Sequence, residues 1–415
     1  MYTYIIYEIV AWVSGAIALF VFVEHLLKTK SVQTFFKRKW VYIPIFVFVI
    51  SFVGGVLSDR TYSPGFAMPM FMHSMAPGGV APTLPFANII NFFKNESRFE
   101  KVADIGRDPN DVPPPLNRDE SLEVKINIKV KEVISEVAPG IYFNYWTFDG
   151  AVPGPMYRVR EGDTIIMSIT NDISSLHHHN IDLHAVTGQG GGASLSDVMP
   201  GETKIFKWKA MNPGLFIYHC AMPNVSTHNS HGQYGLILVE PKEGLSKVDK
   251  EFYVVQGELY TVGDIGKKGL TIFDSEALVD GHPNYVTFNG RIESAPRMHA
   301  KVGDKIRIYV GNGGVNLISS FHVIGEIFDK VYPEGAIGEG SSVYKNVQTT
   351  AVLPGGSTIV EFKVDVPGKY LLVDHALARM NKGAWAVLEV TGSSTPEIYS
   401  QVDGETTDME GSKSK

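Results

Sequence analysis

The residues best suited to chemistry in this chain are a neighbouring histidine and cysteine, His219 and Cys220. Cys220 is the only cysteine among 415 residues, so it cannot form an intramolecular disulfide. It follows the apolar run Gly214–Tyr218, which is typical of a β-strand. Adjacent side chains on a strand point to opposite faces. Two metal-ligating residues at these positions would therefore serve two separate sites.

The thiolate face predicts an electron-transfer site. One thiolate with two imidazoles and a weak axial ligand is the donor set of a blue-copper centre. His179 lies upstream of Cys220, and His228 follows it by eight residues, on the loop before the next strand. The axial residue is expected five positions beyond His228, where the chain has a glutamine, and an amide oxygen is an accepted axial ligand. The predicted ligands are His179, Cys220, His228 and Gln233.

The opposite face predicts a second metal site. His179 and His184 are five residues apart, so on a strand they point to opposite sides. This leaves His184 with His219 on the outer side of the first domain, and His375 takes a similar place in the second. Three imidazoles with an open position suit a catalytic copper site for a small ligand. Asp182 shares the parity of His184 and is expected beside this metal as a proton donor or hydrogen-bond partner.

Some alternatives to these assignments remain open, and others are excluded. His177 and His178 adjoin His179, and either is an alternative ligand. The segment Gly188–Gly192 is not a phosphate-binding loop, because no Lys followed by Ser or Thr comes after it. A single cysteine excludes a disulfide framework and any zinc or iron–sulfur site that needs several thiolates.

An internal repeat predicts two copies of one β domain that would position these residues. Residues 159–170 resemble 301–310, residues 200–208 resemble 354–362, and residues 212–218 resemble 366–372. We therefore predict an all-β fold of two antiparallel Greek-key sandwiches. They are expected over 121–242 and 243–392. Cys220 aligns with Asp374 in this repeat, so the second copy lacks the thiolate.

Composition agrees with packed β domains and argues against nucleic-acid binding. Hydrophobic residues make up 44% of the chain and charged residues 20%, which favours a folded protein. The 41 Gly and 23 Pro suit the many tight turns of all-β domains. The net charge of −7 and the lack of a basic stripe with interleaved aromatic residues give no indication of a nucleic-acid partner.

The N-terminal region predicts a membrane anchor. Two apolar segments, about 4–27 and 40–57, are each long enough to predict a transmembrane α-helix, so residues 1–58 are expected to form a helical hairpin. Positively charged loops stay on the cytoplasmic side. Everything after the hairpin is therefore expected on the periplasmic side. The basic residues between the two segments are Lys28, Lys30, Lys37, Arg38 and Lys39.

Two further regions are predicted to lie outside the folded domains. Residues 59–120 are expected to form a Pro- and Met-rich linker, and residues 393–415 a disordered polar tail. Thioethers are soft ligands for Cu(I), so the linker predicts either copper capture or a flexible apolar segment. Its candidate ligands are Met68, Met70, Met72, His73 and Met75.

From about residue 111 to 392 the sequence resembles the copper-containing nitrite reductases. This resemblance implies two cupredoxin domains, a homotrimer, and one-electron reduction of nitrite to nitric oxide. It also implies a redox donor, for which a cupredoxin, a cytochrome c or a membrane-bound donor are the options. The motifs that carry the resemblance are Trp146–Gly150, His179–His184, Tyr218–Ala221, Gly235–Pro241, Phe321–Glu326 and Val373–His375.

The resemblance also implies a role for each site residue. His375 would come from the neighbouring subunit, and Asp182 and His322 would form the proton-handling pair. Most family members have Met where this chain has Gln233, and an axial oxygen is expected to lower the potential of the first copper. The implied ligands are His179, Cys220 and His228 for a type 1 copper, and His184, His219 and His375 for a type 2 copper, giving two coppers per subunit.

Three other functions compete with this interpretation. A membrane-tethered copper electron carrier would need only the thiolate site and would leave the second group of histidines unexplained. A related copper reductase would act on another small nitrogen or oxygen compound. A multicopper oxidase would need several His-x-His pairs for a trinuclear cluster, and outside the run 177–179 the chain has none.

Overall fold

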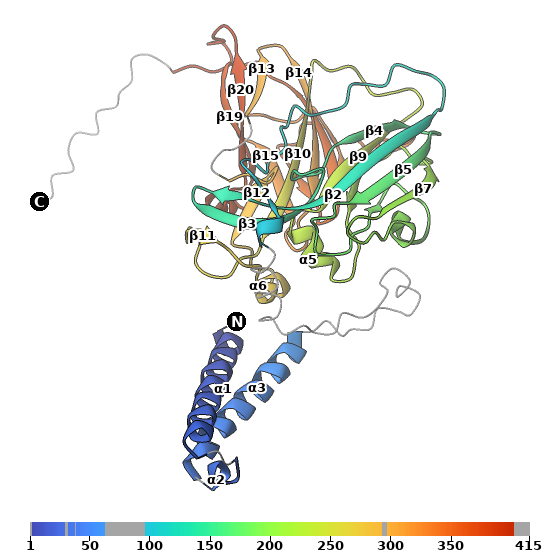
Figure 1. The fold of residues 1–415 in the computed structure, drawn as a ribbon. Helices are drawn as coiled ribbons and strands as arrows, with labels where there is room; N and C mark the ends of the chain where they lie inside the picture. The colour runs from blue at the N-terminus through green and yellow to red at the C-terminus, as the bar shows by residue number, and fades with distance from the viewer. Residues whose placement is uncertain (1, 30–31, 38, 63–95, 293–296, 402–415) are drawn as a thin grey trace, which may run out of the picture. The chain divides into compact units, whose positions relative to one another are not determined.

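The computed structural model describes residues 2–29, 32–37, 39–62, 96–292 and 297–401 (Figure 1). The chain divides into two compact units, Met1–Ser97 and Arg98–Lys415. The Met-rich stretch from Met68 to Met75 and the tail after residue 401 lie outside the described residues. Copper capture by that stretch and disorder of that tail therefore stay predictions.

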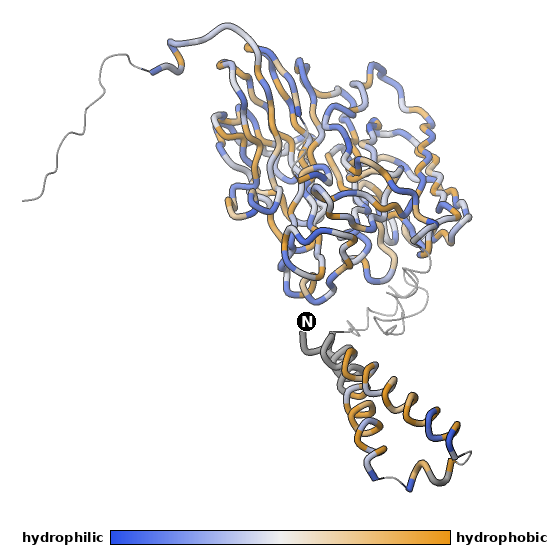
Figure 2. The backbone as a smooth tube through the Cα atoms, turned by 60° about the vertical axis from the view of Figure 1, so that its left-hand side comes forward, coloured by the Kyte–Doolittle hydropathy of each residue, from blue (hydrophilic) through white to orange (hydrophobic). Residues whose placement is uncertain are grey.

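The first unit is helical. Helices α1 and α3 pack against each other, and at Gly15 a Cβ atom would lie 3.0 Å from the Phe48 ring, so glycine permits the close approach. Hydrophobic residues predominate along both helices (Figure 2). The elements are α1 (Tyr2–Thr29), α2 (Val32–Phe36), the 3₁₀ turn η1 (Lys39–Val41) and α3 (Tyr42–Tyr62).

The described residues contain one candidate membrane span of the two that the sequence predicts. Among the described residues, only the segment Ile9–Thr29 is long and apolar enough to cross a membrane. The apolar part of the second helix, Lys39–Val53, is shorter. Helix α3 itself continues to Tyr62, so the second span stays a prediction. A membrane anchor and a signal sequence both meet the criterion that the first one passes.

The second unit begins with two sheets that face each other. Strand β1, inside the expected linker, pairs with β2, so the β unit extends upstream of the predicted boundary at residue 121. One sheet has the order β11 (Gly269–Leu270), β3 (Ile141–Phe148), β2 (Glu123–Ala138), β5 (Thr164–Asn171), β7 (Thr203–Lys209), with β1 (Glu100–Val102) beside β2. The other has the order β4 (Tyr157–Arg160), β9 (Tyr234–Glu240), β8 (Gly214–His219), β6 (Asp182–Leu183). Short helical turns are η3 (Glu96–Arg98), η4 (Gln189–Leu195) and α5 (Val225–Ser230).

A second pair of sheets follows in the same unit. One has the order β12 (Tyr285–Phe288), β10 (Lys250–Leu259), β14 (Lys305–Asn312), β18 (Ser357–Lys363), β16 (Lys330–Tyr332). The other has the order β13 (Arg297–Lys301), β20 (Trp385–Thr391), β19 (Gly368–Asp374), β15 (Ser319–Val323), β17 (Thr349–Val352). Helical turns here are α6 (Ser275–Val279), η5 (Pro333–Gly335) and η6 (Leu377–Lys382).

The strand pairings confirm the internal repeat. Strand β2 runs parallel to β5, as β10 runs parallel to β14, so the sheets are mixed and the prediction of purely antiparallel sandwiches is wrong. Strand β8 runs antiparallel to β9, as β19 does to β20. The fold is therefore mostly β, with two similarly paired sandwiches. Strand β11 lies in the second half of the sequence but pairs with β3 of the first sandwich, so the two halves share a sheet.

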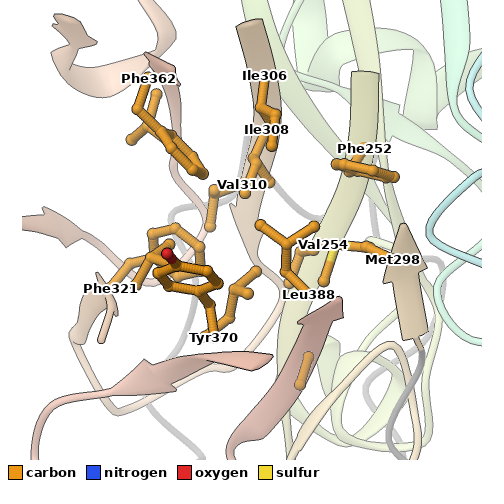
Figure 3. Close-up of a cluster of buried hydrophobic side chains, with 14 of the residues drawn as sticks. Phe252, Val254, Met298, Ile306, Ile308, Val310, Phe321, Phe362, Tyr370 and Leu388 are labelled. Atoms are coloured by element: carbon orange, nitrogen blue, oxygen red, sulfur yellow. The ribbon is translucent and has the colours of Figure 1, made fainter. Parts of the chain in front are cut away.

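Each sandwich has its own core, and a third cluster lies between them. Alternate side chains of strand β9 pack into two different clusters. Ile237 and Val239 belong to the core of the first sandwich. Leu236 and Leu238 belong to the cluster that also includes residues of β10 and β14. Both faces of this strand are therefore covered by protein. Figure 3 shows the core of the second sandwich, where side chains from β10, β14 and β20 meet.

A buried network of charges joins the two sandwiches. Arg158 on β4 forms ion pairs with Glu240 and, at 2.7 Å, with Glu251 on β10. Glu251 also pairs with Arg307 on β14 at 2.8 Å, and Arg307 Nε donates to Glu361 at 2.8 Å. Both arginine side chains are almost completely buried. One carboxylate thus neutralises arginines from both sandwiches and fixes their contact.

Candidate metal centre

The end of strand β8 separates the two key side chains, as strand parity predicts. Tyr218 and Cys220 belong to the core of the first sandwich, and Cys220 is fully buried. His219 lies on the other face, where it is partly exposed and opposite Asp182 of β6. The backbone N–H of Cys220 donates to the carbonyl of Gln233 at 3.1 Å, which holds this end of the strand in place.

Three buried side chains form the inner cluster: His179, Cys220 and His228. Cys220 Sγ lies 4.0 Å from His179 Nδ1 and 3.3 Å from His228 Nδ1. Ligands around one tetrahedral metal ion lie about 3.3–3.8 Å apart, since each bond is about 2.0–2.3 Å long. His228 comes from helix α5, and His179 is held by a bridge to Val198, so three separate segments converge.

The chemistry of this inner cluster fits a soft metal ion. Burial raises the pKa of the Cys220 thiol to about 12, so without a cation the thiol keeps its proton. Burial also lowers the pKa values of His179 and His228, which keeps both imidazoles neutral and able to ligate. A bound cation would displace the thiol proton and would be coordinated by the thiolate and by the lone pairs of the two imidazoles.

Gln233 lies beside this cluster. The side chain is fully buried, and its Oε1 lies 3.1 Å from His228 Nδ1. Its Nε2 is buried without a hydrogen-bond partner. The same nitrogen of His228 thus faces both the thiol and the amide oxygen, which a shared ion between the three donors would explain.

The two alternative histidines lie elsewhere. His177 is about half exposed and stacks on Trp146, with ring centroids 4.2 Å apart. His178 is similarly exposed and lies 3.4 Å from Asp197. Of the three consecutive histidines, only His179 places a ring nitrogen with Cys220.

Two residues that sequence reasoning missed surround the inner cluster. Glu132 on β2 is fully buried, and its Oε1 lies 3.3 Å from His179 Nε2. Burial acts to raise the pKa of Glu132, but hydrogen bonds from His177 and His179 outweigh it and hold the pKa well below its usual range. Trp146 contacts the His228 ring at 4.6 Å between centroids. A signal for Glu132 was present: it shares the inward parity of Ile128 and Val130, where a charge is unusual.

The outer cluster consists of Asp182, His184 and His219. The two Nε2 atoms of the histidines lie 3.1 Å apart, and Asp182 Oδ2 lies 4.0 Å from His219 Nε2. His219 Nδ1 lies 2.9 Å from the carbonyl of Cys220, so it is the donor and Nε2 is left with a free lone pair. Burial raises the pKa of Asp182, while His219 and His184 act to lower it.

A glycine-rich segment makes room for Asp182. Gly191 adopts a φ of +54°, and a Cβ there would lie 1.9 Å from Asp182 Oδ1. The next glycine, Gly192, packs the same way against Phe206. The segment Gly188–Gly192 therefore leaves space for the carboxylate of Asp182. The sequence showed only that this segment is not a phosphate-binding loop.

His322 and His375 form a separate pair on the second sandwich. Their ring centroids lie 5.4 Å apart, and His322 Nδ1 lies 2.5 Å from the carbonyl of Gln348. His322 faces Val373 in the β15–β19 register, as Asp182 faces His219 in the β6–β8 register, so the two are equivalent positions of the repeat. Among the described residues of one chain, His375 is not part of the ligand group that contains His184 and His219.

The second copy fills its thiolate position with an ion pair. Asp374 is fully buried and forms a 2.6 Å ion pair with Arg379. Its other oxygen accepts hydrogen bonds from the backbone N–H groups of Ser320 and Ala376. Both of its oxygens are therefore bonded to protein, and among the described residues of this sandwich no metal-ligating group forms around it.

Comparison with known proteins identifies the family. Residues 130–244 match the multicopper oxidase family model. The chain is 54% identical over 295 residues to a copper-containing nitrite reductase of Neisseria gonorrhoeae, covering 70% of this chain and 74% of that protein. The chain belongs to the copper-containing nitrite reductase family. It is therefore a copper-dependent oxidoreductase, and the resemblance seen in the sequence is confirmed.

More distant nitrite reductases share the fold of the β unit. The Alcaligenes faecalis protein is 32% identical, over 68% of this chain and 79% of its own length. A copper nitrite reductase structure from Nitrosomonas europaea superposes with a TM-score of 0.58 at 33% identity, covering 66% of this chain and 96% of that one. These matches confirm a cupredoxin-like β fold.

Proposed function

We propose that the enzyme reduces nitrite to nitric oxide in its outer cluster with electrons received by its inner cluster. The reaction consumes one electron and two protons per nitrite and releases one water. Nitrite reduction by this chain is supported by its 54% identity to a nitrite reductase over most of that protein. The roles of the individual residues are supported by the geometry of the two clusters.

One observation carries the proposal: consecutive residues belong to different clusters. Cys220 lies with His179 and His228, and His219 lies with Asp182 and His184. A single peptide link therefore joins the two clusters. A copper-binding electron carrier would need only the first of them, so the second cluster favours an enzyme. Among the described residues these are the two groups of close metal-ligating side chains, and neither has the several His-x-His pairs of a trinuclear oxidase site.

We assign the ligands as the sequence predicted. Copper would supply one-electron transfer at the type 1 site and a Lewis-acid position for nitrite at the type 2 site. The assignment is supported by the convergence of soft and imidazole donors in the inner cluster and of imidazoles in the outer one. The type 1 ligands are His179, Cys220, His228 and Gln233, and the type 2 ligands are His184, His219 and His375.

Asp182 and His322 are the proposed proton-handling pair. Asp182 lies 4.0 Å from His219, beside the ligand cluster where nitrite would bind. Burial raises its pKa toward values at which a carboxyl group carries a proton. The backbone carbonyl of Gln348 orients His322 through Nδ1, which leaves Nε2 for a proton transfer.

A homotrimer would complete the outer site. His184 and His375 are both exposed, and they belong to different sandwiches of the chain. A neighbouring subunit that places its second sandwich against this first sandwich would bring a copy of His375 and His322 to His184 and His219. We therefore propose that the catalytic site forms between subunits.

The helical unit is the proposed membrane attachment, through α1. The span Ile9–Thr29 has the length and hydropathy for this role. Basic residues in the connection after α1 favour the cytoplasmic side for that connection, and the β unit is proposed to be periplasmic. Cell fractionation tests the attachment: removal of residues 1–58 is expected to move the enzyme from the membrane to the soluble fraction with activity toward artificial donors retained.

Copper counting combined with a cysteine variant tests the two-site assignment. The wild-type chain is expected to bind two copper ions and to show the intense visible absorption of a Cu(II)–thiolate bond. Cys220→Ser is expected to retain one copper per chain and to lose that absorption. Because electrons would no longer enter through the inner cluster, the variant is also expected to lose nitrite reduction driven by an electron donor. Retention of the absorption, or loss of both copper ions with the fold intact, would contradict the assignment.

A further inference from the structure

Glu132 is a buried carboxylate whose hydrogen bonds all converge on the loop that carries a type 1 ligand. Its Oε1 accepts from the backbone N–H groups of Leu176 and His177 at 2.8 and 2.9 Å. The same atom lies 3.1 Å from His177 Nδ1 and 3.3 Å from His179 Nε2. It is 47 residues away from His179 in the sequence, on strand β2.

Among the described residues, no lysine or arginine forms an ion pair with this carboxylate. Glu132 is fully buried, and within the described part of the chain its ion-pair partners are His177 and His179 alone. Its second oxygen, Oε2, is buried without a hydrogen-bond partner. A buried charge without a counterion is strongly unfavourable, so a positive charge is expected nearby.

The geometry of His179 shows where that charge would be. Its Nε2 faces Glu132, and its Nδ1 faces Cys220 Sγ at 4.0 Å. A neutral imidazole that donates from Nε2 presents a lone pair at Nδ1, on the side of the inner cluster. A carboxylate behind a ligating histidine fixes its tautomer and ring orientation and makes it more basic.

We propose that Glu132 is a positioning residue for the type 1 copper, acting through His179 as a carboxylate–histidine–metal chain. Its negative charge favours Cu(II) over Cu(I), because the more highly charged ion gains more from a nearby anion. Glu132 thus lowers the type 1 potential in the same direction as the axial oxygen of Gln233. The inference rests on the type 1 site proposed above.

The competing explanation is that Glu132 only fastens the loop through Leu176 and His177. Glu132→Gln separates the two, because a glutamine oxygen still accepts from both backbone N–H groups but carries no charge. Glu136→Gln is the matched control, since Glu136 lies on the same strand and is exposed. Both variants are prepared as the full copper-loaded chain.

The readouts are the type 1 reduction potential, the Cu(II) affinity of the thiolate site, and the melting temperature of the copper-free chain. In Glu132→Gln we expect a higher potential and Cu(II) affinity lower by about 10- to 100-fold, the usual effect of losing such a partner. Glu136→Gln should match the wild type in both. A potential and affinity equal to those of the control would overturn the proposal and leave the loop-fastening explanation.

A second variant and a wild-type control cover two other outcomes: a Glu132→Gln chain that does not fold, and a chain without a type 1 site. If Glu132→Gln does not fold, Glu132→Asp replaces it, because the shorter side chain withdraws the carboxylate from His179. Weaker Cu(II) binding in that variant supports the proposal, and unchanged binding overturns it. Thiolate absorption in the wild type is measured in parallel: its absence would contradict the proposed function itself, whereas its presence with unchanged variants would refute only the role of Glu132.

Discussion

At the scale of single residues, the face of strand β8 on which a side chain lies decides which of the two clusters it joins. Cys220 is fully buried with two neutral histidines, whereas His219 faces Asp182 at the surface. This division was predictable from two adjacent letters of the sequence, since strand parity is a strict geometric rule. The contribution of Glu132 was not predictable to the same degree, because nothing local indicates that a residue 47 positions away lies behind His179.

The axial residue is expected to set the type 1 potential. Gln233 Oε1 is a harder donor than a thioether, so it favours Cu(II). Gln233→Met should therefore raise the type 1 reduction potential while the thiolate absorption remains. A redox titration followed at the absorption band measures this. A potential that stays the same or falls would argue against Gln233 as the axial ligand.

Asp182 is expected to act in turnover and not in copper retention. Asp182→Asn removes the proton donor from the outer cluster, and turnover should fall by about 10²- to 10⁴-fold, the usual contribution of general acid catalysis. Copper content should stay at the wild-type level. Steady-state nitric oxide production and metal analysis of the same sample test this, with the exposed Asp264→Asn as control. Near wild-type rates would remove Asp182 from the mechanism.

At the scale of elements, short segments position the site between long strands. The repeat predicted the paired strands of both sandwiches, because long apolar alternation is a strong signal. It missed β1 and β11, which have three and two residues and no pattern of their own. The sequence also did not predict that the glycines at 188–192 leave space for Asp182. That role depends on the three-dimensional position of the Asp182 side chain.

Gly191 is expected to control the position of Asp182. In Gly191→Ala the new Cβ would meet Asp182 Oδ1 and would also strain a backbone with φ of +54°. Nitrite turnover should fall, on the order of 100-fold for a carboxylate displaced by about 1 Å. The type 1 absorption should be unchanged. Gly244→Ala is the control, because φ there is +74° but nothing lies within 4 Å of the added Cβ. Equal activities in the two variants would show that Gly191 does not control the position of Asp182.

At the scale of the whole molecule, Glu251 is expected to hold the sandwiches together. Glu251→Gln leaves two buried arginines without their shared counterion, which should cost about 3–5 kcal/mol of stability. The exposed pair Arg297–Glu389 is the comparison, and Arg297→Gln should cost less than about 1 kcal/mol. Denaturation midpoints measure both. Similar losses in the two variants would contradict the role given to the network.

The same carboxylate gives the fold a pH dependence of known sign. Burial acts to raise the pKa of Glu251, but Arg158, Tyr309 and Arg307 outweigh it, so the pKa lies below its usual value of 4.5. A depressed pKa in the folded state means that the stabilisation is complete above pH 4.5 and is lost as the pH falls through the lowered value. Melting temperatures of wild type and Glu251→Gln should converge in that acidic range.

The sequence predicted the helical N-terminal unit better than it predicted the assembly of the β unit. Residues 1–58 were recognised as apolar and helical, and among the described residues one of the two predicted spans is a candidate for crossing a membrane. The proposed assembly would unite His184 and His219 with a partner's histidines, and it is inferred from exposed residues on both sandwiches.

The central claim is that one electron stored at the thiolate cluster reduces one nitrite at the histidine cluster. A single-turnover experiment tests it directly: the copper-loaded enzyme is reduced, freed of excess reductant and mixed with nitrite, while thiolate absorption and nitric oxide are recorded together. The absorption should return in step with nitric oxide, at one molecule per electron removed from the type 1 site. Return of the absorption without nitric oxide, or no return at all in enzyme that holds two coppers per chain, would contradict the account.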